Sequence, residues 1–434
     1  MNLSQSFLIF IAITFSAAIQ AENITRGPYL QQGSHDSTIL RWRTETPSIG
    51  KVWYGKKATR LKSHAVETVA TLYHEIKLEN LNPKTRYHYA IGSESQSKPA
   101  TDKEHFFITS PRPGKAKPTR IWVIGDSGTA NDDANAVYQA YRDYNGDRYT
   151  DLWLMLGDNA YTHGTDEQYQ AAVFDTYPEI LSQSPLWPTI GNHDAKSIDT
   201  SNQSGVYYDL FTLPKNGEVG GAPSGTEAYY SFDYGNIHFL CLASISVDRS
   251  VGAEMYQWAK KDLENSKAKW LITFFHHPTY TKGSHDSDKD LQLIEMRENY
   301  LPLLEKYGAD LVLSGHSHSY ERSYLVDGHY GHSHTLDSKA HFLDGGDGRI
   351  DGDGAYTKAT NGLGSNEGSV NIVAGSSGKV SKMGGKVTLD HPVMFLSLLE
   401  LGSLVIDVKS NQMNVVFLNE KGESKDHFTI VKKH

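Results

Sequence analysis

Five short apolar runs in this chain each end in a residue that can bind a metal ion. Each run has the length of one strand, and its unbroken apolar character is typical of a strand buried on both faces in an α/β sheet. In such sheets, ligands bind where the carboxyl ends of the strands meet. We therefore expect the polar side chains that follow the runs to converge on one site. The runs and their following residues are 121–125 and Asp126, 152–157 and Asp158, 187–191 and Asn192, 270–275 and His276, and 311–315 and His316.

The chemistry of these motifs predicts a pair of first-row metal ions. Carboxylate and amide oxygens, a phenol and imidazoles suit such ions better than calcium or a thiolate-bound structural zinc. Asp158 follows the run expected at the centre of the sheet, so it is the natural bridging ligand. Two ions about 3.5–4 Å apart can clamp the attacking and departing oxygens at phosphorus, with metal-bound hydroxide as the nucleophile. The motifs are Asp126-x-Gly128, Gly157-Asp158-x-x-Tyr161, Gly191-Asn192-His193-Asp194, His276-x-Pro278 and Gly315-His316-x-His318.

The 434 residues are sufficient for two domains. The segment 22–112 contains short runs that alternate at period two between turn signals, which predicts an all-β, fibronectin type III-like sandwich. From residue 119 onward strands alternate with helices, so 119–434 is expected to be an α/β domain. Within it, the Gly- and Asp-rich segment 327–368 is predicted to be a long loop insertion. The expected helices are 131–142, 168–181, 253–265 and 291–307.

The beginning of the chain has the features of a secretory signal peptide, assigned to residues 1–21. An apolar run at 7–19 is too short to span a bilayer and ends in small residues, with cleavage expected after Ala18 or Ala21. The run is not preceded by Lys or Arg, so an uncleaved anchor is the alternative. No other stretch has the length of a transmembrane helix. The mature chain is expected to be secreted or periplasmic, without a membrane span.

The charge composition of the chain limits the classes of partner that it is expected to bind. The net charge is −9 and no block rich in Lys and Arg is present, so nucleic acid is not expected as a main partner.

Cys241 is the only cysteine, so no internal disulfide can form, and its apolar surroundings predict an inert buried thiol. The Gly- and Asp-rich string 344–354 lacks the EF-hand pattern and is interpreted as turns. Gly375-Ser-Ser-Gly-Lys379 lacks the first glycine of a P-loop and is interpreted as a turn after a strand.

The five motifs, in this order, resemble those of the purple acid phosphatases within the calcineurin-like metallophosphoesterases. The likeness extends to the N-terminal sandwich and to Ser319-Tyr-Glu-Arg322. Tyr161 is the discriminating residue, because other metallophosphoesterases lack a tyrosine there. The resemblance implies a two-sheet α/β sandwich flanked by helices. It also implies a purple colour, from charge transfer between a tyrosinate and ferric iron.

The resemblance also implies roles for individual residues. Further histidines of the family line the phosphate pocket and protonate the leaving group; His193 matches by motif and His285 by approximate position. Adjacent His276 and His277 depart from the family, which usually has one histidine before x-Pro. Spacing favours His276 as the ligand and predicts that His277 points to the opposite face of its strand. The implied ligands are Asp126, Tyr161, His318 and bridging Asp158 for Fe(III), and Asn192, His276, His316 and Asp158 for a divalent Fe, Zn or Mn.

Together these features predict a secreted acid phosphatase that hydrolyses small-molecule phosphomonoesters. One alternative is a phosphodiesterase or nucleotidase of the same fold with two divalent metals. Another is a non-catalytic secreted binding protein with a structural metal centre. The preferred substrate, the second metal and the oligomeric state are left open by the sequence.

Overall fold

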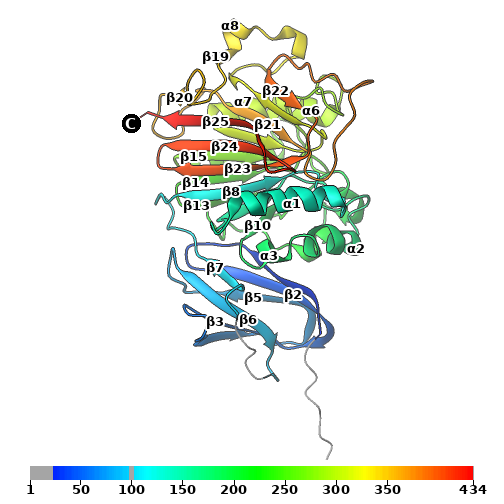
Figure 1. Ribbon diagram of the computed structural model, residues 1–434, viewed down its shortest axis with the longest axis vertical. Coiled ribbons are helices and arrows are strands. Elements are labelled where there is room, and N and C mark those ends of the chain that lie inside the picture. The colour runs from blue at the N-terminus through cyan, green and yellow to red at the C-terminus, as the bar shows by residue number, and fades with distance from the viewer. Residues whose placement is uncertain (1–22, 97–101, 434) are drawn as a thin grey trace, which may run out of the picture.

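The computed structural model describes residues 23–96 and 102–433. The expected signal peptide therefore lies outside the described residues. The chain forms a small all-β sandwich followed by a larger two-sheet sandwich with helices on its outer faces (Figure 1). This arrangement confirms the fold class expected from the sequence. Among the described residues, none of the helices combines the length and the apolar character needed to cross a bilayer.

The small sandwich is built from strands that alternate between buried and exposed side chains. In β5, for example, His74, Ile76 and Leu78 are buried, whereas the residues between them are exposed. Trp42 and Tyr89 fill much of the space between the two sheets. One sheet contains β1 (Ile24–Gln31), β2 (Thr38–Ser48) and β5 (Thr71–Leu78); the other contains β4 (Ser63–Val66), β3 (Gly50–Gly55), β6 (Arg86–Ser93) and β7 (Phe106–Ile108).

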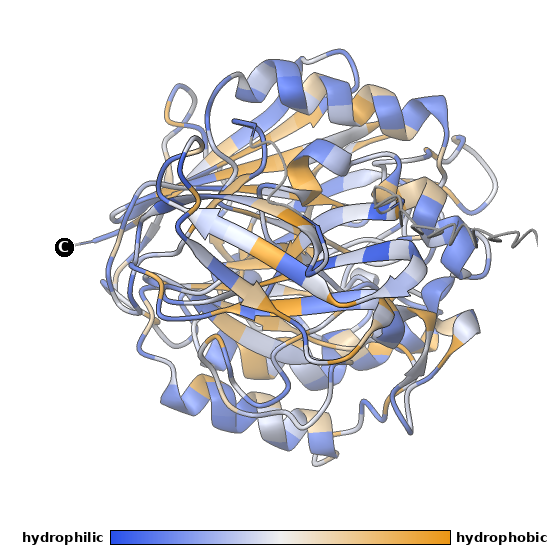
Figure 2. Ribbon diagram, turned by 90° about the horizontal axis from the view of Figure 1, so that it is seen from below, coloured by the Kyte–Doolittle hydropathy of each residue, from blue (hydrophilic) through white to orange (hydrophobic). Residues whose placement is uncertain are grey.

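The larger sandwich contains two seven-stranded mixed sheets. Apolar residues concentrate on the strands in the middle of the molecule, while the surrounding helices carry many hydrophilic residues (Figure 2). In spatial order, the first sheet is β10 (Leu186–Pro188), β9 (Leu152–Met155), β8 (Thr119–Ile124), β23 (Gly402–Lys409), β24 (Gln412–Asn419), β25 (Ser424–Lys432) and β20 (Tyr356–Lys358). The second is β13 (Tyr230–Tyr234), β14 (Ile237–Cys241), β15 (Trp270–Phe274), β16 (Leu311–Ser314), β21 (Val370–Ala374), β17 (Tyr320–Ser323) and β22 (Met394–Leu398).

The five apolar runs form strands as expected, but they are divided between the two sheets. β8, β9 and β10 are parallel neighbours in the first sheet, and β15 and β16 are parallel neighbours in the second. The expectation that the run before Asp158 lies at the centre of a sheet is wrong, because β9 is next to the edge strand β10. All four residues of β9 are nevertheless buried.

Two of the four expected helices are regular, namely α1 (Asp132–Asn145) and α5 (Glu254–Asn265). Asn131 caps α1 by accepting a hydrogen bond from the backbone N–H of Ala134. The other two are interrupted by π-helical turns. In 168–181, α2 (Asp166–Tyr169) passes into a π turn (Gln170–Phe174), and α3 (Pro178–Leu181) starts anew at a proline. In 291–307, α6 (Leu291–Glu295), a π turn (Met296–Tyr300) and α7 (Leu301–Lys306) follow one another.

The segment 327–368 contains short regular elements as well as loops. β19 (Phe342–Asp344) pairs with β18 (Leu325–Val326), and β20 pairs with β25 at the end of the first sheet. The segment thus covers an edge that would otherwise be open. Its helices are η4 (Ser333–Thr335) and α8 (Ser338–His341); elsewhere the chain forms η2 (Asp194–Ser197), β11 (Ile198–Asp199), β12 (Ser204–Gly205) and α4 (Val206–Leu210).

Polar contacts attach the small sandwich to the larger one. Arg26 of β1 and Arg43 of β2 both bind the carboxylate of Asp166, at 2.8 and 2.6 Å. The Tyr89 hydroxyl donates to the carbonyl oxygen of Ser182, at 2.7 Å.

Cys241 of β14 is fully buried and unpaired, and burial raises the pKa of its thiol to about 12. It therefore stays protonated and inert, as expected.

Candidate metal centre

The turns that follow the strands aim their side chains into the space between the two sheets. Asp126, Asp158 and His316 have φ values of 54°, 52° and 66°, in the left-handed region that residues other than glycine rarely adopt. Such backbone strain persists only where the surrounding structure enforces it, and it clusters at functional sites. Gly191 is required by close approach, since a Cβ there would lie 2.1 Å from the backbone nitrogen of Asp158.

Three of the expected ligands form one group, namely the buried Asp126 with Tyr161 and His318. The Tyr161 hydroxyl donates to Asp126 Oδ1 at 2.9 Å, and His318 Nε2 lies 3.4 Å from the same oxygen. The distance between the Tyr161 hydroxyl and His318 Nε2 is also 3.4 Å. Burial raises the pKa of Tyr161 well above its usual value, and Asp126 and Asp158 raise it further. In the metal-free protein this phenol therefore keeps its proton.

A second group surrounds His276. Its Nε2 lies 3.0 Å from Asn192 Oδ1 and 3.1 Å from His316 Nδ1. Nδ1 of His276 donates to the carbonyl oxygen of Leu156, at 2.8 Å, which turns Nε2 toward the other donors. Burial alone would lower the pKa of His276, but Asp158 and Asp126 raise it. Burial and the neighbouring imidazoles hold the pKa of His316 well below its usual value, so His316 is neutral.

Asp158 lies between the two groups. Its Oδ1 accepts a hydrogen bond from the backbone N–H of His193, at 2.8 Å, and lies 3.5 Å from His276 Nε2. Ligand atoms of Asp126, Asp158 and His276 all lie within 4.8 Å of one another. The structure thus brings together all seven expected metal ligands in these two adjoining groups.

The donor set suits metal ions. Asn192 Oδ1, Asp158 Oδ1 and His316 Nδ1 are acceptors that all lie close to His276 Nε2. In the metal-free protein a single proton on Nε2 offsets this concentration of lone pairs, consistent with the raised pKa of His276. A divalent cation would serve the same purpose with greater charge.

The two histidines expected in the pocket flank the ligand groups on different sides. His193 Nε2 lies 3.8 Å from Asp158 Oδ2, and its ring packs edge-on against Tyr161 with 4.5 Å between centroids. The His285 ring stacks on that of His316, with 3.7 Å between centroids, and its Nδ1 lies 2.9 Å from Asp290 Oδ2. Burial lowers the pKa of His285, an effect that Asp290 opposes. Both rings remain partly exposed.

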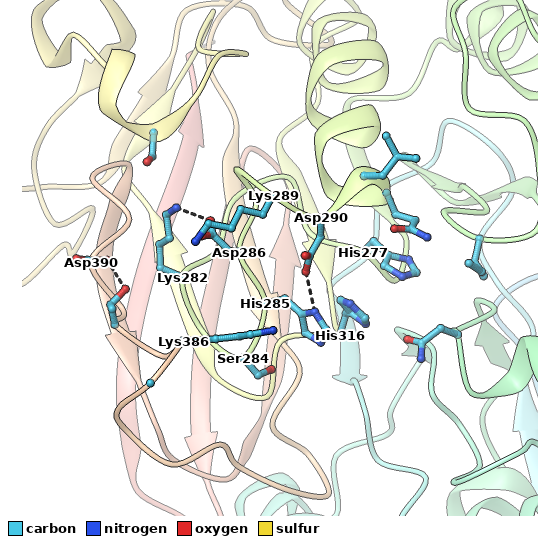
Figure 3. Close-up of a pocket in the computed structure, with 17 residues that line it drawn as sticks. His277, Lys282, Ser284, His285, Asp286, Lys289, Asp290, His316, Lys386 and Asp390 are labelled. Carbon is cyan, nitrogen blue, oxygen red and sulfur yellow. Dashed lines mark hydrogen bonds and ion pairs between the residues drawn. The ribbon is translucent and has the colours of Figure 1, made fainter.

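A cavity of about 950 Å³ opens beside the second group (Figure 3). Asn192, His277, His285 and His316 form its inner wall. Lysines and aspartates form the outer wall, including Lys282, Lys289, Lys386, Asp286 and Asp390. A polar cavity of this size, next to the candidate metal ligands, can admit a charged small molecule.

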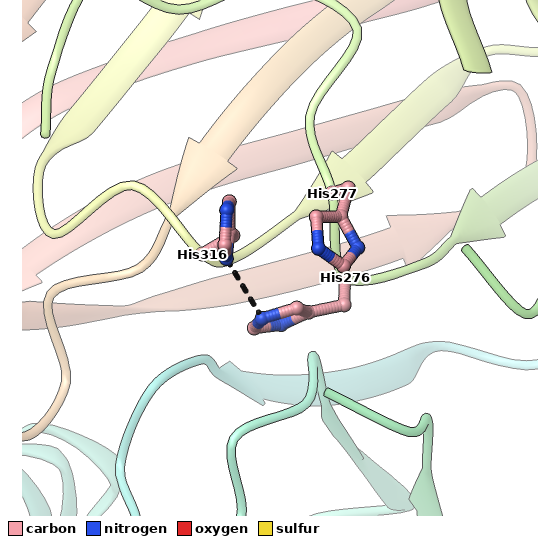
Figure 4. Close-up of side chains that lie close together, drawn as sticks. All are labelled: His276, His277 and His316. Atoms are coloured by element: carbon pink, nitrogen blue, oxygen red, sulfur yellow. Dashed lines mark hydrogen bonds between the residues drawn. The ribbon is translucent and has the colours of Figure 1, made fainter. Parts of the chain in front are cut away.

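The prediction that His277 points away from the site is wrong. Its ring lies 4.2 Å from that of His316 and 4.9 Å from that of His276, between centroids (Figure 4). β15 ends at Phe274, so the alternation of faces within a strand no longer applies at residue 277. Ser244 holds the ring in place, since its Oγ lies 2.8 Å from His277 Nδ1.

Sequence reasoning gave no role to two further residues of the site. Asp194 is buried and accepts hydrogen bonds from the backbone N–H groups of Asn159 and Gly191, at 3.1 and 2.9 Å, so it joins the loops after β9 and β10. Lys379 places its Nζ 3.6 Å from the centroid of the Tyr161 ring. Asp194 belongs to the motif Gly191-Asn192-His193-Asp194, and this motif was the signal that could have identified it. The turn that ends in Lys379 carries no signal that would place the lysine beside Tyr161.

Comparison with known proteins gives two family matches. Residues 119–320 match the calcineurin-like phosphoesterases, and residues 26–109 match the N-terminal domain of purple acid phosphatases. Purple acid phosphatase 15 of Arabidopsis thaliana is 32% identical over 59% of this chain and 50% of its own length. Probable inactive purple acid phosphatase 1 of the same plant is 27% identical over 58% of this chain and 43% of its own length. The chain thus spans half or less of these two relatives.

Solved structures show the same architecture. A purple acid phosphatase from yellow lupin (Lupinus luteus) seeds superposes with a TM-score of 0.70, at 19% identity, over 94% of this chain and 75% of that one. At this level of identity the likeness concerns the fold.

Proposed function

This chain belongs to the purple acid phosphatases of the calcineurin-like phosphoesterase family, and on that premise we propose that it is a secreted or periplasmic acid phosphatase that hydrolyses phosphomonoesters. The observation that carries the proposal is the convergence of Asn192, His276 and His316 on one point beside Asp158. A structural metal site would be closed, whereas this one opens into a large polar cavity. That access favours catalysis over a purely structural role.

Two metal positions follow from the two groups of ligands. Asp126, Tyr161 and His318 would hold Fe(III), Asn192, His276 and His316 would hold a divalent Fe, Zn or Mn, and Asp158 would be shared. When bound, the two cations would lower the pKa of water and neutralise the phosphate oxygens. Because burial raises the pKa of its phenol, Tyr161 would bind as a tyrosinate only beside a highly charged cation such as Fe(III).

The protein's own residues would then orient the ester and move protons. His285 is held by Asp290, whose carboxylate accepts a hydrogen bond from Nδ1–H and leaves Nε2 for the substrate. Below its pKa, the His285 imidazolium can protonate the departing oxygen, and this favours activity in acid. A positioned general acid of this kind contributes about 10²–10⁴-fold to the rate. His193 flanks the opposite side, where its ring can contact a phosphate oxygen.

The test is turnover by metal-loaded protein. We expect wild type to hydrolyse p-nitrophenyl phosphate much faster than bis(p-nitrophenyl) phosphate. Asn192→Ala should lose most of that activity with its circular dichroism unchanged. Asn202→Ala, at an exposed loop position, is the matched control and should retain wild-type rates. Equal rates for Asn192→Ala and wild type would point instead to a binding protein, as the relative named inactive makes worth testing.

The substrate panel addresses the other alternative. A preference for the diester, together with two divalent metals and no iron in elemental analysis, would contradict the phosphomonoesterase proposal and favour the phosphodiesterase. N-terminal sequencing of the exported protein tests secretion. A mature chain that begins after Ala18 or Ala21 is the expected result.

A further inference from the structure

The turn Gly375–Lys379 follows β21 and is held in place by both sheets. Ser377 Oγ donates to the carbonyl oxygen of Gly402, at 2.8 Å, and accepts from the N–H of Gly125, at 3.2 Å. Gly375 allows close contact, because a Cβ there would lie 2.2 Å from the carbonyl oxygen of Ser317. The backbone that carries Lys379 is therefore fixed with respect to the metal-ligand loops.

The side chain of Lys379 lies against the face of the Tyr161 ring. Its Nζ is 3.6 Å from the ring centroid, and the side chain is half-buried. Within residues 23–96 and 102–433, no hydrogen bond or ion pair holds this ammonium group. Lys196, on the same side of the site, differs because it donates to the carbonyl oxygen of Thr162, at 3.0 Å. The ring is thus in direct contact with the Lys379 charge, which the carboxylates of Asp126 and Asp158 also attract without forming an ion pair.

We propose that Lys379 is a positioning residue that places a positive charge against the ring of Tyr161 and so sets the colour of the site. The inference rests on the proposed function, in which Tyr161 binds ferric iron. An ammonium ion over an aromatic face is attracted by the electrons of the ring. It stabilises those electrons most when the ring carries the negative charge of a tyrosinate.

One consequence follows from Coulomb's law. Charge transfer from tyrosinate to iron moves an electron away from the ammonium group, so the transition requires more energy when Lys379 is present. Removal of the charge should lower that energy.

The experiment compares iron- and zinc-loaded wild type with Lys379→Met, Lys379→Gln and Lys379→Arg. Lys382→Met is the matched control, because Lys382 is an exposed lysine on the same loop. We expect the visible band of both neutral variants to move to longer wavelength. Lys379→Arg and Lys382→Met should match wild type. Two neutral variants are included because either one can test the inference if the other does not fold.

The outcomes separate the inference from its premise. A coloured wild type whose band is unmoved in a folded neutral variant overturns the inference alone. A wild type that remains colourless after iron loading refutes the ferric site at Tyr161, and the inference is refuted with it.

Discussion

A buried ion pair joins the two sheets of the larger sandwich, and its removal gives the sharpest prediction about stability. Asp426 of β25, in the first sheet, accepts from Arg322 of β17, in the second, through Nε and Nη2 at 2.5 and 3.0 Å. Both side chains are completely buried. The Tyr320 hydroxyl also donates to Asp426, at 2.7 Å, and the guanidinium group lies 4.4 Å from the centroid of Phe395.

Asp426→Asn keeps the shape of the side chain but leaves two guanidinium groups without their counter-charge, that of the buried Arg322 and that of the partly exposed Arg349. Removal of one partner from a buried pair costs about 3–5 kcal/mol, because the remaining charge stays desolvated. The two direct hydrogen bonds and the additional donor Tyr320 place the expected loss toward the upper end. For domains of 150–250 residues, each kcal/mol lowers the melting temperature by about 2–4 °C, and the lower end applies to a larger domain such as this one. The expected decrease for this variant is therefore about 10 °C.

The assays are thermal unfolding and urea unfolding of the metal-free protein, both followed by circular dichroism. Replacement of both buried partners, as Arg322→Met with Asp426→Leu, should recover much of the loss, since the only charge then left without its partner is that of Arg349, which is partly exposed. Asp351→Asn is the control, because its partner His427 lies at the surface and no measurable change is expected. The reasoning is refuted if Asp426→Asn unfolds at the wild-type urea concentration.

Three further predictions concern the site and the pH dependence of stability. Tyr161→Phe should abolish the visible band of the iron-loaded protein, and a retained band would exclude this tyrosine as the chromophore. His285→Ala should lower kcat by about 10²–10⁴-fold for esters with poor leaving groups and much less for p-nitrophenyl phosphate; an equal loss for both would contradict a role as general acid. Burial opposes the charge of His238, but Asp233 and Asp262 raise its pKa to about 10. This stabilisation is complete below the unfolded pKa of about 6.5 and is lost as the pH rises toward 10, so the urea midpoint should fall over that interval in wild type but not in His238→Gln.

The strand ends could be predicted from sequence because each depends on a local pattern. The run before His276 is apolar at every position, and a residue that ends such a run lies at the edge of a sheet wherever the sheet is placed. The set of ligands could be assembled because five such ends carry compatible chemistry. α1 was equally predictable, since Asn131 supplies its cap and apolar positions recur along one face.

The remaining features depend on contacts between distant segments. β9 lies between β8 and the edge strand β10, and this position in the sheet depends on the order of all seven strands. His277 packs on His316 because β15 ends earlier than its apolar run suggests. Lys379 reaches Tyr161 across more than two hundred positions of sequence, and no local pattern encodes such a contact.

The division of the ligands between the two sheets has a mechanical consequence. Asp126 extends from the first sheet and His318 from the second; Asn192 and His276 are divided in the same way. A bound ion at either position would therefore link the two sheets, and chelation would remove that link. At a free metal concentration one hundred times Kd, each bound ion would increase the free energy of unfolding by about 2.7 kcal/mol. Resistance to heat and to proteases should then rise and fall with the metal supply of the compartment in which the protein resides.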